Sequence, residues 1–125
     1  MRYLLDTHVL LWAATLDKKL PKEILDILQN KDFDVSYSVI CVWELVIKEA
    51  KEKITLPDNF FLELPNLGFN CLSIKEAYIH TLRKIPVNHG DPFDRMLIAQ
   101  AMTENMTLIT CDKKLTDYPV KIFTL

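Results

Sequence analysis

The chain has 125 residues, of which 50% are hydrophobic and 26% charged, a balance that suits one packed domain over residues 1–125. No apolar run reaches the roughly 18 uninterrupted residues of a membrane-spanning helix, which argues against an integral membrane protein of that kind. The formal net charge of −2 argues, taken by itself, against a basic nucleic-acid-binding face.

The first residues and the cysteines indicate a cytoplasmic protein. Asp6 and His8 interrupt the apolar start of the chain and no small-residue cleavage site follows, so we do not expect a secretory signal. Cys41, Cys71 and Cys111 are an odd number, are widely spaced and form no Cys-x-x-Cys motif. We therefore expect neither disulfides nor a zinc site, but buried thiols in a reducing compartment.

The first half of the chain predicts short strands that alternate with helices. In chain order, the patterns predict a buried strand over residues 2–5, a helix capped by Thr7, a helix that begins at Pro21, a strand over 34–36 and a helix from Ser38 to about Lys53. The apolar side of this last helix is expected to comprise Ile40, Trp43, Ile47 and Ala50.

The second half continues the alternation. The patterns predict a helix from Pro57 to Leu64, a strand over 68–72, a helix capped by Ser73, an irregular segment over 85–90, a helix from Asp91-Pro92 to about Asn105, and strands over 107–110 and 120–123. Such alternation predicts a parallel sheet with helices on both faces. Ligands of these sheets bind beyond the carboxyl ends of the strands, where the winding order reverses.

Two acids directly follow predicted buried strands. Asp6 ends the first strand and Asp112 comes just after the strand over 107–110, so both are candidates for a site at the strand ends. Each also has a purely structural interpretation, because Asp commonly caps helices and begins turns. For Asp112 the two interpretations have equal weight.

Glu44 lies among apolar residues in the predicted helix from Ser38. A buried carboxylate is costly unless a cation compensates its charge, which favours a functional role for Glu44. The structural alternative is an ion pair with Lys48, which is four residues further along the same helix.

The segment from His89 to Arg95 holds two further acids. Asp91 precedes Pro92 as a helix cap would, so whether Asp91 is a cap or a ligand stays open. Asp94 begins a helix whose following residues are mostly apolar, and its side chain is therefore expected to point into the groove at the helix start.

Four stretches of the sequence resemble the PIN domain of VapC-type toxins, and they follow the order of that family over nearly the whole chain. They are Tyr3-Leu4-Leu5-Asp6-Thr7-His8, Val42-Trp43-Glu44-Leu45, the run from His89 to Ala101, and Leu108-Ile109-Thr110-Cys111-Asp112. The resemblance implies an α/β fold, a three-layer α/β/α arrangement with a short central parallel sheet. It also implies a metal-dependent ribonuclease that is the toxin of a type II toxin–antitoxin pair.

The resemblance further implies which residues bind metal and which partners to expect. The metal-binding acids correspond to Asp6, Glu44 and Asp94, with Asp112 as a more variable fourth and Asp91 outside the core set. Relatives of this kind usually form homodimers and are silenced by a cognate antitoxin whose tail occupies the groove. Aromatic residues that could serve such interfaces, or simply pack in the core, are Trp12, Phe60, Phe61 and Tyr78.

Converging carboxylates predict a specific chemistry. They repel one another without divalent cations, and ligation by oxygen alone suits Mg²⁺ or Mn²⁺. Such an ion activates water for hydrolysis of an RNA phosphodiester bond. Without these acids the remaining charge is mildly basic. The cations near them in the sequence could hold the RNA backbone, with Arg95 and Lys113 as the first candidates; the others are Lys48, Lys51, Lys53 and Lys114. The alternative function is a non-catalytic PIN-like interaction or RNA-binding module in which the acids are only caps.

Overall fold

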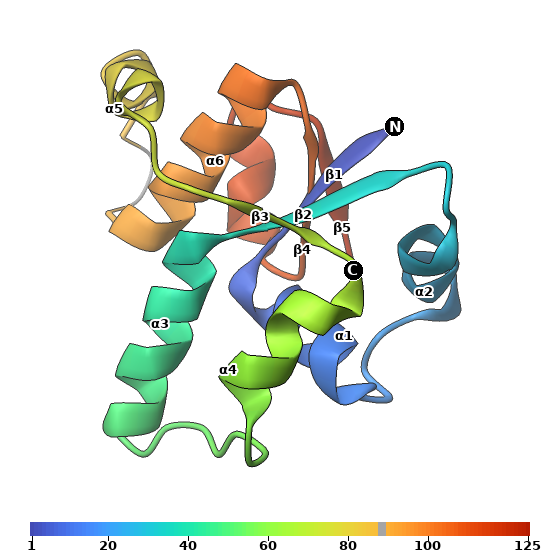
Figure 1. Ribbon diagram of the computed structural model, residues 1–125. Helices are drawn as coiled ribbons and strands as arrows, with labels where there is room; N and C mark the ends of the chain where they lie inside the picture. The colour runs from blue at the N-terminus through green and yellow to red at the C-terminus, as the bar shows by residue number, and fades with distance from the viewer. Residues whose placement is uncertain (88–89) are drawn as a thin grey trace.

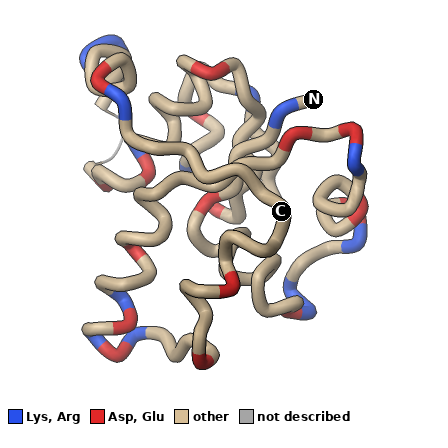
Figure 2. The backbone as a smooth tube through the Cα atoms, viewed as in Figure 1, with Lys and Arg blue, Asp and Glu red and all other residues tan. Residues whose placement is uncertain are grey.

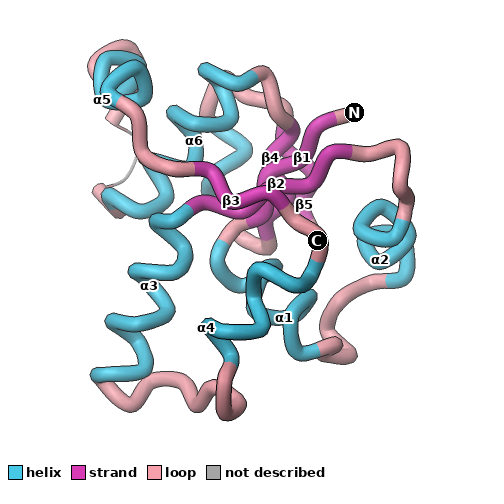
Figure 3. The backbone as a smooth tube through the Cα atoms, in the orientation of Figure 1, coloured by secondary structure: helices cyan, strands magenta, loops and turns pink. Residues whose placement is uncertain are grey.

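The carboxyl ends of all the strands lie at one edge of the sheet, because every pair of neighbouring strands is parallel. The computed structural model describes residues 1–87 and 90–125, so His89 and its neighbour Asn88 lie outside the described residues. The described strands are β1 (Arg2–Leu5), β2 (Asp34–Ser38), β3 (Asn70–Leu72), β4 (Thr107–Thr110) and β5 (Ile122–Thr124). Their order in the sheet is β3-β2-β1-β4-β5, as Figure 3 shows.

The described helices cover both faces of this sheet, as the sequence predicts. They are α1 (Thr7–Thr15), α2 (Lys22–Gln29), α3 (Val39–Ala50), α4 (Phe60–Glu63), α5 (Glu76–Leu82) and α6 (Pro92–Glu104), with 3₁₀ helices η1 (Leu64–Leu67) and η2 (Lys113–Asp117). In Figure 1, α5 and α6 lie on one side of the strands and α1, α2 and α4 on the other. No helix in the described ranges is both long and apolar enough to cross a bilayer.

The strands at the centre of the sheet explain the position of the site. β1 and β4 are neighbours, and their apolar side chains Leu4, Leu5, Leu108 and Ile109 are fully buried. The chain winds outward from β1 through β2 to β3 and then returns to β4 on the other side of β1. The winding order therefore reverses between β1 and β4, and Asp6 and Asp112 follow these two strands.

Helix ends correct several of the predicted boundaries. Asp6, not Thr7, caps α1, since its side chain accepts a hydrogen bond from the Val9 amide. α5 begins at Glu76 without a side-chain cap, so the prediction that Ser73 caps it is wrong. α4 is a single turn that begins at Phe60 instead of Pro57. In contrast, the predicted bounds of α6 are confirmed, and the structure shows Asp91 as its N-cap and Asn105 as its C-cap.

α3 buries a different side from the predicted one. Its buried residues are Ile40, Cys41 and Leu45, whereas Trp43 is 58% exposed. The reason is that α3 extends from the end of β2 and packs against α1 and α6 more than against the sheet (Figure 1). Trp43 instead places its ring edge-on to Phe93 at the start of α6, with 5.3 Å between ring centroids.

The three cysteines are free, and the sequence predicts no disulfide between them. The expectation that all of them are buried holds only for Cys41, because Cys71 is exposed on the edge strand β3 and Cys111 is partly exposed. Of the four aromatic residues considered above, Phe60 and Tyr78 are buried in the core.

Candidate active site

A cavity of about 170 Å³ lies where the ends of β1 and β4 meet α3 and the start of α6. We call it the acidic cleft. Its described lining residues are Asp6, Thr7, His8, Glu44, Lys48, Asp91, Asp94, Cys111 and Asp112. The structure thus brings all five predicted acids together, although they come from four separate parts of the chain.

Asp6 is held in place by hydrogen bonds to both of its carboxylate oxygens. Oδ1 accepts from the Val9 amide at 2.9 Å, and Oδ2 accepts from the Thr110 hydroxyl and from the Cys111 amide at 3.4 Å. Burial raises the pKa of Asp6, and these hydrogen bonds oppose that rise. The helix-cap interpretation of Asp6 is therefore correct, and the same side chain also lines the cleft.

Glu44 has a partner at each carboxylate oxygen as well. The Thr7 hydroxyl donates to Oε1 at 2.5 Å, and the Lys48 ammonium lies 3.3 Å from Oε2. The side chains of Glu44 and Lys48 are 15% and 24% exposed, so their ion pair lies inside the cleft and not on the open surface. The ion pair weighed as a structural alternative is present, and it forms part of the cleft.

Asp94 has no hydrogen bond or ion pair at its carboxylate from the described residues. Its pKa is raised to about 7, first by burial and then by neighbouring negative charge. The acids that contribute this charge are Asp91, Glu44, Asp112 and Asp6. At neutral pH Asp94 is therefore protonated in part of the molecules, which reduces the negative charge of the cleft.

Asp91 and Asp112 are both caps. Oδ1 of Asp91 accepts from the amides of Phe93 and Asp94 at 2.9 and 3.1 Å, and Oδ1 of Asp112 accepts from the Lys114 amide at 2.9 Å. In each carboxylate these bonds use one oxygen only. Capping is therefore compatible with a second role in the cleft.

The donor set of the cleft fits a hard divalent cation. Five carboxylates face a single lysine among the described lining residues, and carboxylate oxygens are the ligands that Mg²⁺ and Mn²⁺ prefer. No three His, Cys, Asp or Glu side chains of the described residues are already arranged to hold an ion. The oxygens of Asp6 and Glu44 instead accept from hydroxyl, amide and ammonium donors.

The two first candidates for RNA contact, Arg95 and Lys113, do not line the cleft, whereas Lys48 does. The Arg95 guanidinium donates to the carbonyl oxygens of Pro86, Leu82 and Ile85 at 2.9, 3.4 and 3.5 Å, which gives this side chain a structural role between α5 and α6. Lys113 is exposed at the start of η2, next to Asp112.

Sequence reasoning did not predict the roles of the two threonines. Thr7 and Thr110 orient Glu44 and Asp6, and the available signal was a hydroxyl residue beside each strand-end acid.

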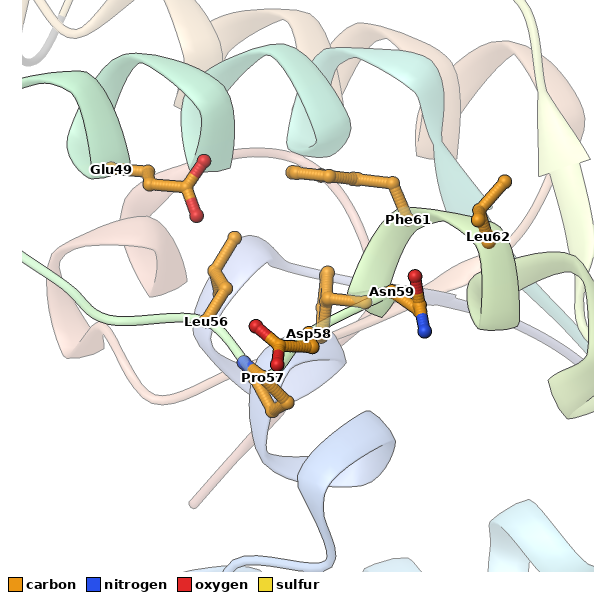
Figure 4. A pocket seen from close by; sticks show the side chains of 8 residues that line it. Glu49, Leu56, Pro57, Asp58, Asn59, Phe61 and Leu62 are labelled. Carbon is orange, nitrogen blue, oxygen red and sulfur yellow. The ribbon is translucent and has the colours of Figure 1, made fainter.

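A larger cavity, of about 320 Å³, lies between the end of α3 and the start of α4. Figure 4 shows the side chains of Glu49 and Asp58 near apolar ones from Leu56, Phe61 and Leu62. This cavity is not at the strand ends, and only two of its described lining residues are acids, against five in the acidic cleft. The acidic cleft is therefore the candidate active site.

A family model described as the PIN domain matches residues 3–121, so the chain belongs to the PIN domain family. No curated protein matches the chain.

Solved structures share the fold at low sequence identity. A chain of VapBC2 from Rickettsia felis, bound to a DNA fragment from the promoter, has a TM-score of 0.74 at 16% identity, with 100% of this chain and 99% of that chain covered. VapBC-1 from nontypeable Haemophilus influenzae gives 0.69 at 19% identity, covering 99% and 98%. FitAcB from Neisseria gonorrhoeae gives 0.67 at 20%, covering 98% and 96%.

Proposed function

We propose that this protein is a metal-dependent endoribonuclease and the toxin of a toxin–antitoxin pair, acting in the cytoplasm as one PIN domain over residues 1–125. The observation that carries the proposal is the convergence of five carboxylates at the β1–β4 switch point, with Asp94 uncompensated by any described side chain. Membership of the PIN family supports it, since PIN domains are in general nucleases.

In this proposal Asp6, Glu44, Asp94 and Asp112 hold Mg²⁺ or Mn²⁺, and Asp91 is a secondary candidate. A cation held there would supply Lewis acidity, lowering the pKa of water in the cleft and neutralising charge on the phosphate. The chain itself orients the carboxylates: Thr110 and the Val9 amide fix Asp6, and Thr7 fixes Glu44. Asp94 would have to lose its proton to hold a cation, so we expect metal affinity to rise with pH around neutrality.

RNA is the proposed substrate because the motifs resemble those of VapC-type toxins. Lys113 is the first candidate for a contact with the RNA backbone, since it is exposed beside Asp112. Arg95 is a weaker candidate, because three carbonyl groups already accept from its guanidinium.

The proposed partners are a cognate antitoxin and a second copy of the chain. The similar solved structures include VapBC complexes, which supports an antitoxin. The exposed apolar residue Leu62 and the cavity of Figure 4 offer such a partner an apolar contact flanked by acids. For the homodimer, α3 presents Val39, Trp43 and Val46 to solvent at 39%, 58% and 46% exposure.

The test is cleavage of matched single-stranded RNA and DNA by the purified protein, with Mg²⁺ or Mn²⁺ and with EDTA. We expect RNA cleavage that EDTA abolishes and that Asp94→Asn lowers by at least about 100-fold, because one ligand and its charge are lost. Asp26→Asn is the matched control, since Asp26 is exposed on α2 away from the cleft.

Three results would contradict parts of the proposal. Full activity of Asp94→Asn would exclude the metal mechanism. Cleavage of DNA alone would exclude the RNA substrate. Binding of RNA without cleavage under any metal condition would establish the non-catalytic alternative.

A further inference from the structure

Lys48 is the one lysine or arginine among the described residues that line the acidic cleft. Its ammonium lies 3.3 Å from Oε2 of Glu44, and only 24% of its side chain is exposed. A partly buried cation among five carboxylates interacts more strongly with them than the two charges of an exposed ion pair interact with each other.

The ion pair occupies an oxygen that the proposed metal site needs. Oε1 of Glu44 accepts from Thr7 and Oε2 pairs with Lys48, so both oxygens have partners in the metal-free protein. A divalent cation that binds Glu44 therefore competes with the Lys48 ammonium for the same carboxylate.

An ammonium displaced from Glu44 would remain in the cleft, because Lys48 lines it, and so near the phosphate of a substrate bound there. Lys48 is one helical turn from Glu44, and its flexible four-carbon chain allows the ammonium to move while the backbone stays in place. Ammonium groups bind phosphate oxygens as point charges. The chain would thus keep one cation in the cleft when metal is absent and use it on the substrate when metal is present.

We propose that Lys48 holds Glu44 in the metal-free protein, leaves it when a divalent cation binds, and then contacts the phosphate that is to be cleaved. This inference rests on the proposed nuclease function. It assigns Lys48 two opposing effects: it weakens metal binding and strengthens substrate binding.

The experiment compares Lys48→Met with Lys31→Met, which removes the same charge from an exposed position just before β2, at the opposite edge of the sheet. Calorimetry measures Mn²⁺ binding, and steady-state kinetics measure RNA cleavage at several salt concentrations. We expect Lys48→Met to bind Mn²⁺ about 3- to 10-fold more tightly, because the competing ammonium is gone. We also expect its KM for RNA to rise about tenfold. The slope of log KM against log salt concentration should fall by about the contribution of one phosphate contact.

Two further variants keep the test decisive. Lys48→Arg retains the charge and should stay close to the wild type in both measurements. Lys48→Gln also removes the charge, and it takes the place of Lys48→Met in the comparison if the latter folds poorly. A wild-type protein that neither binds Mn²⁺ nor cleaves RNA overturns the nuclease proposal itself. A wild type that does both, with Lys48→Met and Lys48→Gln indistinguishable from Lys31→Met, overturns the role of Lys48 alone.

Discussion

Asp94 differs from the other acids of the cleft because no described donor compensates its charge. Asp6, Glu44, Asp91 and Asp112 each accept a hydrogen bond from a hydroxyl or an amide. Burial and the negative charge of these neighbours raise the pKa of Asp94 to about 7 from its ordinary value of 3.8. Asp94 therefore makes the stability of the metal-free protein depend on pH.

We predict that the metal-free protein loses stability as pH rises from about 4 to about 7. Between the ordinary pKa of 3.8 and the folded value of about 7, the folded state binds more protons at Asp94 than the unfolded state does. The free energy of unfolding therefore falls with pH, by about 1 kcal/mol once solvent screening of a partly exposed group is allowed for. Urea unfolding in EDTA at a series of pH values measures this change.

The matched variants for this prediction are Asp94→Asn and Asp6→Asn. Asp94→Asn should remove much of the pH dependence and raise the melting temperature at neutral pH by about 4 °C. Asp6→Asn should lower it, because an amide NH₂ in place of Oδ2 would face the Cys111 amide donor. A decrease in melting temperature for Asp94→Asn would show that charge repulsion at this position is unimportant.

At the scale of elements, α6 has the most clearly encoded ends. Pro92 is its first residue, and Asp91 has φ −71° and ψ 111°, the extended conformation that a residue before proline favours. In this conformation the Asp91 carboxylate reaches the amides of Phe93 and Asp94. The cap thus fixes the start of the helix that carries Asp94 into the cleft.

We predict that Asp91→Ala unfolds more easily than Asp91→Ser, by about 1 kcal/mol. Both variants remove the charge that acts on Asp94, but only the serine hydroxyl can still accept from the helix amides. The comparison of these two variants measures the contribution of the cap alone. A comparison with the wild type would combine it with the loss of charge repulsion between Asp91 and Asp94. Equal melting temperatures of the two variants would mean that the Asp91 cap contributes nothing to stability.

The elements that the sequence predicted well are those with local signals. β1, β4 and α6 follow from apolar runs of strand or helix length with an acid or proline at their ends. The buried side of α3 could not be read in this way, because it depends on which neighbours the helix meets after β2. The start of α4 at Phe60 follows the left-handed backbone of Asn59 (φ 61°), a conformation that Asn adopts more readily than most residues but that its sequence alone does not fix.

The acids of the cleft were predictable because each stands at a strand end, at a helix start or amid apolar helix residues. Their partners were not. The contact of Thr7 with Glu44 and that of Thr110 with Asp6 join residues 37 and 104 positions apart. Likewise, sequence proximity suggested Arg95 as a substrate contact. In the structure its guanidinium donates hydrogen bonds to backbone carbonyl oxygens of residues 82–86 instead.

At the scale of the whole molecule, the distribution of charge and of exposed apolar side chains bears on assembly. Figure 2 shows acidic and basic residues interspersed at the far end of α3 and along the turn that follows, so this part of the molecule has no single-sign face. Closer to the sheet, α3 exposes Val39, Trp43 and Val46, which have helical spacing. We therefore place the proposed homodimer contact on that face of α3.

We predict that the wild type sediments as a dimer and that Trp43→Glu is a monomer, because a charge in the centre of an apolar contact is costly to bury. Trp43 is 58% exposed, so the variant should keep its fold, as circular dichroism would verify. Leu16→Glu is the control, since Leu16 is 77% exposed at the end of α1. A wild type that is monomeric at all concentrations would contradict this assignment.

The pairing of β1 with β4 has a consequence for the order in which the protein is made. Asp6 leaves the ribosome well before the groups that orient its Oδ2, because the Thr110 hydroxyl and the Cys111 amide lie 104 and 105 positions further along the chain. Asp94 and Asp112 also emerge long after Asp6. A growing polypeptide therefore cannot assemble the cleft until residue 112 has been added, and any activity of this centre begins only after that point.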